Sequence, residues 1–287
     1  MKLNENNVEK IINLLSQNNY TFGEGELSDL EIRQIKKQSK DSRGIYGVNA
    51  PIGINVFSFI AQNEDVVFQL QDFEDSDLDA MIIKYSPKSE RKYIVINSAK
   101  PLINQVFAAV HEFYHYQYSF TGNPKETFIC SFNKKDKEEI KANRFAAEFL
   151  LPEEALKSEL DSFFKFQSNF EDALISKQIV FCFSLVIKYA LPLKAVLYRL
   201  KEENITSTDF LFSHYADVKC ILLEMANDFP LLKDLYSNSN KYVHESLYDL
   251  VPLLYNKGRL DDSTLNNIIK QFDLSESQIK EGLISNE

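Results

Sequence analysis

Two histidines and a glutamate in the middle of the chain have the spacing of a zinc-binding motif. His111 and His115 are four residues apart, and Glu112 directly follows the first of them. In a helix, residues four apart lie one turn apart on the same face, so both imidazoles can reach one metal ion. Glu112 is turned about 100° around the helix axis from His111, where its carboxylate can take a proton from water. The motif predicts a zinc site in which His111 and His115 are ligands and Glu112 is the catalytic base.

The same residues also have a plainer interpretation. Two histidines at this spacing occur on ordinary amphipathic helices, where they are partly exposed and bind nothing. Against that interpretation, the chain contains only four histidines, and two of them lie in this motif. The other two, His214 and His244, have no partner at metal-ligand spacing, so we expect them to be structural.

A catalytic zinc ion keeps three protein ligands and leaves one position for water, so a third ligand is required. Glu139 lies 24 residues after His115, near the start of the next strongly predicted helix. Asn143 follows Glu139 by four residues and shares its face, so its amide can hydrogen-bond the outer nitrogen of a ligand histidine. The alternative is that Glu139 is a surface glutamate in a helix start of mixed charge.

Helical phase distinguishes Glu139 from its neighbour Glu138. A wholly charged stripe of this helix, which should face water, contains Lys137, Lys141, Arg144 and Glu148. Glu138 lies on a stripe that is otherwise apolar. Glu139 lies on the stripe of Asn143, where a second polar group stands one turn beyond the carboxylate, as a buried ligand and its hydrogen-bonding partner require. We therefore predict that Glu139 completes the zinc site.

The elements that must position these residues are a small sheet followed by helices. Alternating apolar runs predict strands at 66–70, 81–85 and 92–96, and a turn-rich segment joins the last two as a hairpin. Helical spacing predicts one helix from residue 101 through the metal motif and a second at 136–150. The remaining predicted helices are 5–16, 27–40, 51–62, 153–165, 171–190, 192–203, 208–227, 244–256, 262–272 and 275–284. The order predicts an α+β fold with a three-stranded sheet and a largely helical C-terminal extension.

Two segments together resemble the ImmA/IrrE family of metallo-endopeptidases. They are residues 109–115 (AVHEFYH) and, more specifically, residues 139–152 (EIKANRFAAEFLLP), which are similar to the family signature Glu-x-x-Ala-Asn/Asp-x-Phe-Ala-Ala-x-x-Leu-x-Pro. The strand at 93–97 and the segment 191–200 also fit, so the resemblance covers about 45–205. It implies a zincin-like core with one zinc ion per chain and, as in the thermolysin group, a glutamate as third ligand, here Glu139.

The resemblance also implies a function. Family members commonly cleave repressors or respond to stress, and they are often encoded near a DNA-binding target. We therefore expect a zinc-dependent endopeptidase that cleaves a transcriptional repressor or antitoxin-like partner encoded nearby. The alternative is a zinc-bound sensor or interaction module that regulates a partner without cleavage. For an extended peptide substrate, the expected pairing partner is an edge strand containing Ile94, Val95, Ile96 and Asn97.

Composition narrows the class of partner and the location. The net charge of −10 repels phosphate backbones and no basic patch offsets it, so we expect no direct nucleic-acid binding. Three widely spaced cysteines are typical of reduced thiols, and the polar N-terminus lacks the apolar core of a signal peptide. The most apolar run, 179–187, is far shorter than the ~20 residues of a membrane helix. We expect a cytoplasmic protein without membrane contact, and the oligomeric state stays open.

The motifs also predict how the chain is divided. Residues 1–45 form an N-terminal helical segment, 46–205 the peptidase core, and 206–287 a C-terminal helical region for partner recognition or regulation.

Overall fold

The computed structural model describes most of the chain between residues 27 and 279. The described residues are 27–45, 47, 51–73, 78–84, 91–119, 127–130, 136–164, 170, 173, 175–203, 208–226, 229–238, 246–271, 274, 275, 277 and 279. The helix expected at 5–16 and most of the helix expected at 275–284 lie outside them. No single helix among the described residues is long and apolar enough to cross a membrane. The segments Ser176–Tyr189 and Leu193–Glu202 taken together are long and apolar enough, but the chain bends by 112° between them.

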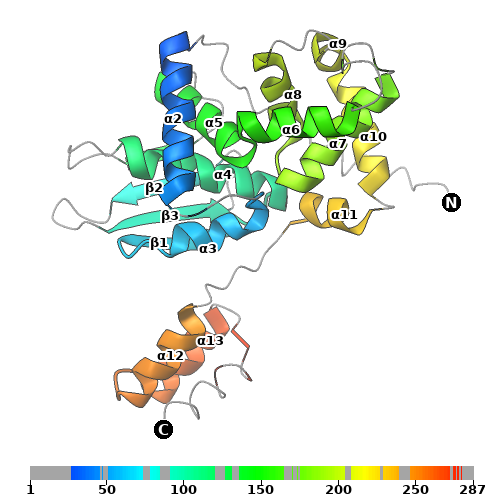
Figure 1. Ribbon diagram of the computed structural model, residues 1–287. Coiled ribbons are helices and arrows are strands. Elements are labelled where there is room, and N and C mark those ends of the chain that lie inside the picture. The colour runs from blue at the N-terminus through cyan, green and yellow to red at the C-terminus, as the bar shows by residue number, and fades with distance from the viewer. Residues whose placement is uncertain are drawn as a thin grey trace.

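A four-stranded mixed sheet lies on one side of the main body (Figure 1). Its strands are β1 (Val66–Gln71), β2 (Ala80–Lys84), β3 (Lys92–Asn97) and β4 (Thr127–Cys130), in the order β1-β3-β2-β4. β3 pairs with β1 in parallel and with β2 in antiparallel, and β4 pairs in antiparallel with the other side of β2. The predicted hairpin of β2 and β3 is therefore confirmed. The sequence does not indicate β4, because four residues are too few to display an alternating pattern.

β3 is an interior strand, which contradicts one prediction. The sequence predicts a free edge at Ile94, Val95, Ile96 and Asn97, yet all four are paired on the β1 side and Ile94 to Ile96 also on the β2 side. Ile94 and Ile96 are fully buried. A strand this apolar belongs in the middle of a sheet, because an exposed apolar edge would invite pairing with other chains.

One helix packs against this sheet and continues into a turn, and a second helix packs along the first. α4 (Leu102–Tyr114) packs on β2 and β3, and it continues into a π-helical turn, His115–Ser119, which we call the π-turn. α5 (Lys137–Leu150) packs along α4. α4 is buried from Ile103 to Tyr114, so it forms the centre of the body rather than an amphipathic surface helix.

The start of α5 is determined by its own sequence. Asp136 caps the helix, since its carboxylate accepts the backbone N–H of Glu138 at 3.2 Å. Glu138 and Glu139 then occupy the first turn, where negative charge is favourable toward the helix dipole. Glu139 is thereby held at a fixed helix end beside α4.

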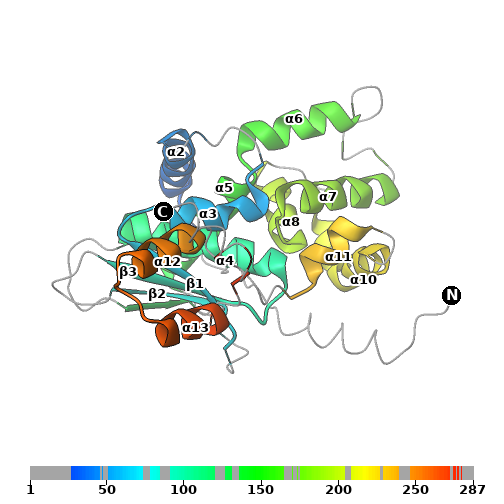
Figure 2. The ribbon, with the colours of Figure 1, turned by 90° about the horizontal axis from the view of Figure 1, so that it is seen from below.

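α2 (Asp29–Ile45) lies across α5 and the α4 segment (Figures 1 and 2). Near its beginning, Glu31 pairs with Lys137 at 2.8 Å, at the start of α5. Near its end, the Ser42 hydroxyl donates to Gln117 Oε1 at 2.6 Å, inside the π-turn. α2 therefore ties the start of α5 and the end of the α4 segment to one rigid element.

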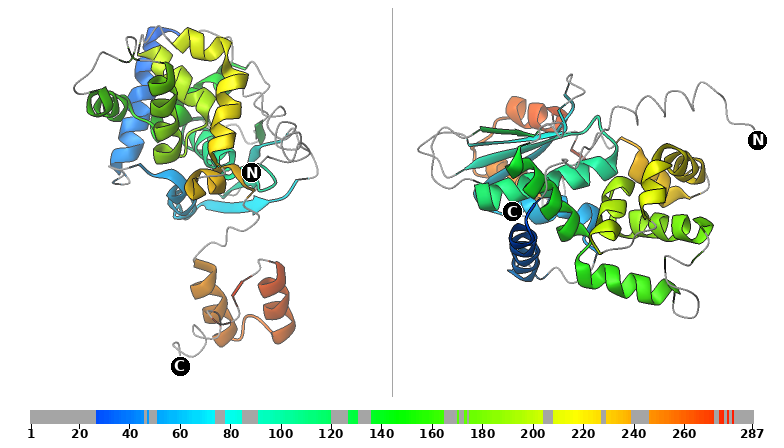
Figure 3. Two further views of the ribbon diagram at one scale, coloured as in Figure 1. Left: turned by 90° about the vertical axis from the view of Figure 1, so that its right-hand side faces the viewer. Right: turned by 90° about the horizontal axis from the view of Figure 1, so that it is seen from above.

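The remaining helices divide into a group beside the sheet, seen in the right-hand view of Figure 3, and a C-terminal pair, α12 and α13, that lies apart from the main body in Figure 1. They are α3 (Val56–Ala61, after the short 3-10 turn Gly53–Asn55), α6 (Glu153–Phe164), α7 (Ile175–Tyr189), α8 (Leu193–Glu202), α9 (Thr208–Ser213), α10 (Tyr215–Ala226), α11 (Pro230–Tyr236), α12 (Ser246–Asn256) and α13 (Asp262–Gln271). The helix predicted at 208–227 is two helices that meet at His214, and α11 is not predicted by the sequence.

The hydrophobic cores do not divide the chain at 45/46 or 205/206. The main core includes Ile35 from α2 and continues through Leu211 and Leu222 to Leu235. A second, small core begins at Val251 and joins α12, α13 and Ile279. The residues that follow 205 thus belong partly to the main body and partly to a separate C-terminal pair of helices.

Two charged residues of α5 are buried, although the sequence places them on a solvated stripe. Arg144 and Glu148 pair at 2.9 Å and are nearly inaccessible to solvent. The reason is Arg199 on α8, which is 0% exposed, pairs with Glu148 at 3.1 Å and donates to the Leu151 carbonyl at 3.1 Å. Burial alone lowers the pKa of Arg199, but Glu148 and Glu202 outweigh it and raise that pKa. This network fixes the C-terminal half of α5 against α8.

Replacing Arg199 should therefore destabilise the protein strongly. Arg199→Met removes one cation of a buried network and leaves Glu148 and Glu202 with Arg144 alone, and breaking a buried ion pair typically costs about 3–5 kcal/mol. Lys40→Met is the control, because Lys40 and Glu154 form an exposed pair, with side chains 78% and 71% accessible, and such pairs contribute less than about 1 kcal/mol. Urea unfolding measures both free energies, and equal losses would contradict this account of the network.

Candidate metal centre

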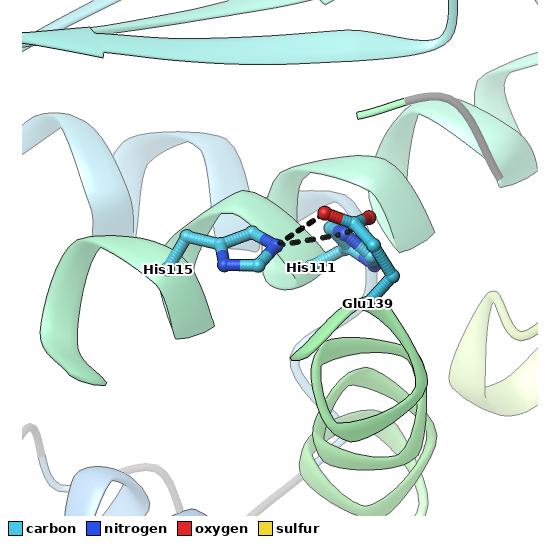
Figure 4. Close-up of side chains that lie close together, drawn as sticks. All are labelled: His111, His115 and Glu139. Atoms are coloured by element: carbon cyan, nitrogen blue, oxygen red, sulfur yellow. Dashed lines mark hydrogen bonds and ion pairs between the residues drawn. The ribbon is translucent and has the colours of Figure 1, made fainter. Parts of the chain in front are cut away.

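Three side chains from two helices converge on one point in the buried body of the protein (Figure 4). His111 and His115 come from the α4 segment, and Glu139 reaches them from the first turn of α5. Their nearest ligand atoms all lie within 4.8 Å of one another, and all three residues are buried. The two Nε2 atoms are 3.2 Å apart, and Glu139 lies 3.1 Å from His111 Nε2 and 3.4 Å from His115 Nε2.

The hydrogen bond to Asn143 determines which nitrogen of His111 carries the proton. Asn143 Oδ1 lies 2.9 Å from His111 Nδ1. An amide oxygen only accepts, so Nδ1 of His111 must be the donor and Nε2 of the neutral ring is left with a lone pair. That lone pair points at the space shared with His115 and Glu139, as a metal ligand requires.

The arrangement fits a metal ion better than it fits a hydrogen-bonded cluster. Electron-pair donors that meet in a buried space repel one another unless a cation lies between them. Burial lowers the pKa of His115, which disfavours an imidazolium there. Two imidazoles and one carboxylate are a donor set that suits zinc and leaves a position open.

The structure brings Glu139, and not Glu138, to the histidines. Glu139 is 5% exposed and faces both rings. The Glu138 side chain is 43% exposed and pairs with Lys141 at 2.7 Å. The difference follows from helical phase, since adjacent residues of α5 point about 100° apart.

Glu112 is the residue that the sequence predicts as the catalytic base. It follows His111 on α4 and is fully buried. Burying a carboxylate is costly, so a fully buried glutamate within the metal motif favours a chemical role over a packing role. A tyrosine hydroxyl near the metal motif could stabilise an oxyanion: Tyr114 donates to Glu138 at 3.5 Å and Tyr93 lies on β3, while Tyr46 and Tyr85 lie outside the described residues.

One neighbour of the site is missed by the sequence reasoning. The Ser119 hydroxyl lies 2.9 Å from His115 Nδ1, the outer nitrogen of the second histidine. The sequence does show a serine four residues after His115. Whether its hydroxyl reaches that histidine depends on the π-turn, which no sequence pattern indicates.

The part of the chain that contains the metal centre matches a known family. Residues 61–201 match the family model described as the IrrE N-terminal-like domain, Peptidase_M78. The match includes all four strands, α4, α5 and every residue of the centre. A search among curated proteins gave no significant match.

Metal affinity should separate the two glutamates at the start of α5. Glu139→Ala removes a ligand and should weaken zinc binding beyond detection in chelator competition. Glu138→Ala is the matched control and should keep the affinity of the unaltered chain, because its carboxylate is directed to Lys141. Asn143→Ala should weaken binding by about 10–100-fold, as the loss of an outer hydrogen bond does. If Glu138→Ala loses the metal while Glu139→Ala keeps it, the assignment is wrong.

Proposed function

The chain belongs to the ImmA/IrrE family of metallopeptidases, and on that basis we propose that it is a zinc-dependent endopeptidase with a regulatory protein as substrate. The observation that carries the proposal is the convergence of His111, His115 and Glu139 in one buried cluster. Glu112 on the same helix supplies the proton-transfer group that peptide hydrolysis needs. A metal site together with a general base serves hydrolysis, whereas a purely structural zinc site would not require Glu112.

The residues of this chain have distinct roles in the proposed reaction. His111, His115 and Glu139 would hold a zinc ion, which would supply a Lewis acid for the scissile carbonyl and lower the pKa of water to about 7. Glu112 accepts the proton of the attacking water and delivers it to the leaving amine. Asn143 keeps the Nδ1 proton on His111, so that the ring presents Nε2 to the site. The hydrophobic surroundings of α4 keep bulk water from competing for these groups.

The overall charge supports a particular class of substrate. The chain carries 42 acidic and 32 basic side chains. An acidic protein attracts basic proteins and repels nucleic acid, and DNA-binding regulators are basic on the surface that contacts phosphates. We propose that the substrate is such a regulator in the cytoplasm, encoded near the gene of this chain. The alternative, a zinc-bound sensor that acts without cleavage, needs no general base.

The role of Glu112 distinguishes the two functions. Glu112→Gln keeps the shape of the side chain and removes the base, so zinc content should stay at one ion per chain while cleavage falls by about 10²–10⁴-fold. Glu154→Gln is the control, since Glu154 is exposed on α6 and paired with Lys40. Cleavage is followed by mass spectrometry on the regulator encoded beside the gene, with unfolded casein as a comparison.

Each outcome of that experiment has a meaning. Cleavage of the regulator at one bond, with casein left intact, is the expected result. Broad cleavage of casein would contradict a site-specific protease and indicate a housekeeping peptidase. Activity of Glu112→Gln near that of the unaltered chain would show that Glu112 is not the base. A zinc-loaded chain that binds the regulator and never cuts it would favour the sensor.

A further inference from the structure

The Nδ1 atoms of the two ligand histidines contact residues from two different elements. His111 donates its Nδ1 proton to Asn143, which the sequence motif contains. His115 Nδ1 lies 2.9 Å from the hydroxyl oxygen of Ser119, at the last position of the π-turn. The ring of His115 is fully buried, and the contact with Ser119 is partly buried.

We propose that Ser119 is the positioning residue of His115, and that the π-turn places its hydroxyl on Nδ1. The proposal rests on the metal site described above, because it concerns how the second imidazole is presented to the metal. A metal on Nε2 requires that the proton of the neutral ring stays on Nδ1. Nδ1 then needs an acceptor, and the hydroxyl oxygen of Ser119 is at hydrogen-bond distance.

The turn that carries Ser119 is itself held in place. Ser42 of α2 is 1% exposed, and its hydroxyl lies 2.9 Å from the Tyr118 hydroxyl as well as 2.6 Å from Gln117 Oε1. Tyr118 also donates to the carbonyl of Gln38 at 3.2 Å. Three residues of the π-turn region thus have partners on α2 or on the imidazole itself, so Ser119 is presented to His115 by a fixed backbone.

π-Helical turns are rare and concentrate at functional sites, because they shift the direction of the residues that follow. Here the π-turn begins at His115, one of the proposed metal ligands. α2, which supports it, precedes the family match that starts at residue 61. The positioning of the second ligand therefore includes an element outside the matched domain.

The test compares side chains of nearly equal shape at position 119. Ser119→Thr keeps a hydroxyl, and Ser119→Val has the shape of threonine without one. Zinc affinity is measured by chelator competition on the full chain. We expect Ser119→Val and Ser119→Ala to bind zinc about 10–100-fold more weakly than the unaltered chain, and Ser119→Thr to bind within about threefold of it. Ser213→Ala is the matched control, because the Ser213 hydroxyl makes the same 2.9 Å contact with the Nδ1 of an exposed histidine, His214.

A second readout separates positioning from general stability. In the zinc-loaded chain, NMR of the imidazole nitrogens should show protected Nδ1–H signals for His111 and His115. Ser119→Val should lose the protection of the His115 signal and keep that of His111. If Ser119→Thr and Ser119→Val bind zinc equally well and the His115 signal does not change, the inference is overturned. If the unaltered chain binds no zinc at all, the proposed function fails first, which distinguishes the two failures.

Discussion

Three electron-pair donors meet in a buried space between α4 and α5, and the rest of the site depends on this electrostatic constraint. Two imidazole nitrogens 3.2 Å apart, with a carboxylate next to both, repel one another unless a positive charge lies between them. The pKa of His115 is lowered by burial, so protonation of its ring does not relieve the repulsion well. A divalent cation relieves it, since the cation is attracted to all three donors at once.

The fold holds these donors in place by several independent contacts. Asp136 caps α5 and fixes its first turn, the buried pairs of Arg144, Glu148 and Arg199 fix its last turns, and α2 spans from the start of α5 to the π-turn. Because donors that repel one another will move apart if they can, the contacts must be rigid before the metal arrives. Preorganisation of this kind reduces what metal binding has to reorder.

The parts of the site that were predictable are those determined by local spacing. The four-residue spacing places His111 beside His115 on one helix face, and helical phase directs Glu139 rather than Glu138 inward. Long-range pairing was not predictable from such patterns. The burial of Arg144 and Glu148 depends on a partner from α8, and the interior position of β3 depends on its parallel pairing with β1, which lies earlier in the chain. Ser119 gains its role only through the π-turn.

The X-ray absorption spectrum of zinc in the zinc-loaded chain tests the central claim most directly. The proposed site predicts a first shell of nitrogen and oxygen alone, at about 2.0–2.2 Å, with the multiple-scattering pattern of two imidazoles. His115→Ala should reduce that pattern to one imidazole. A sulfur shell at about 2.3 Å, or an imidazole pattern that the substitution leaves unchanged, would contradict the assignment of the metal to His111, His115 and Glu139.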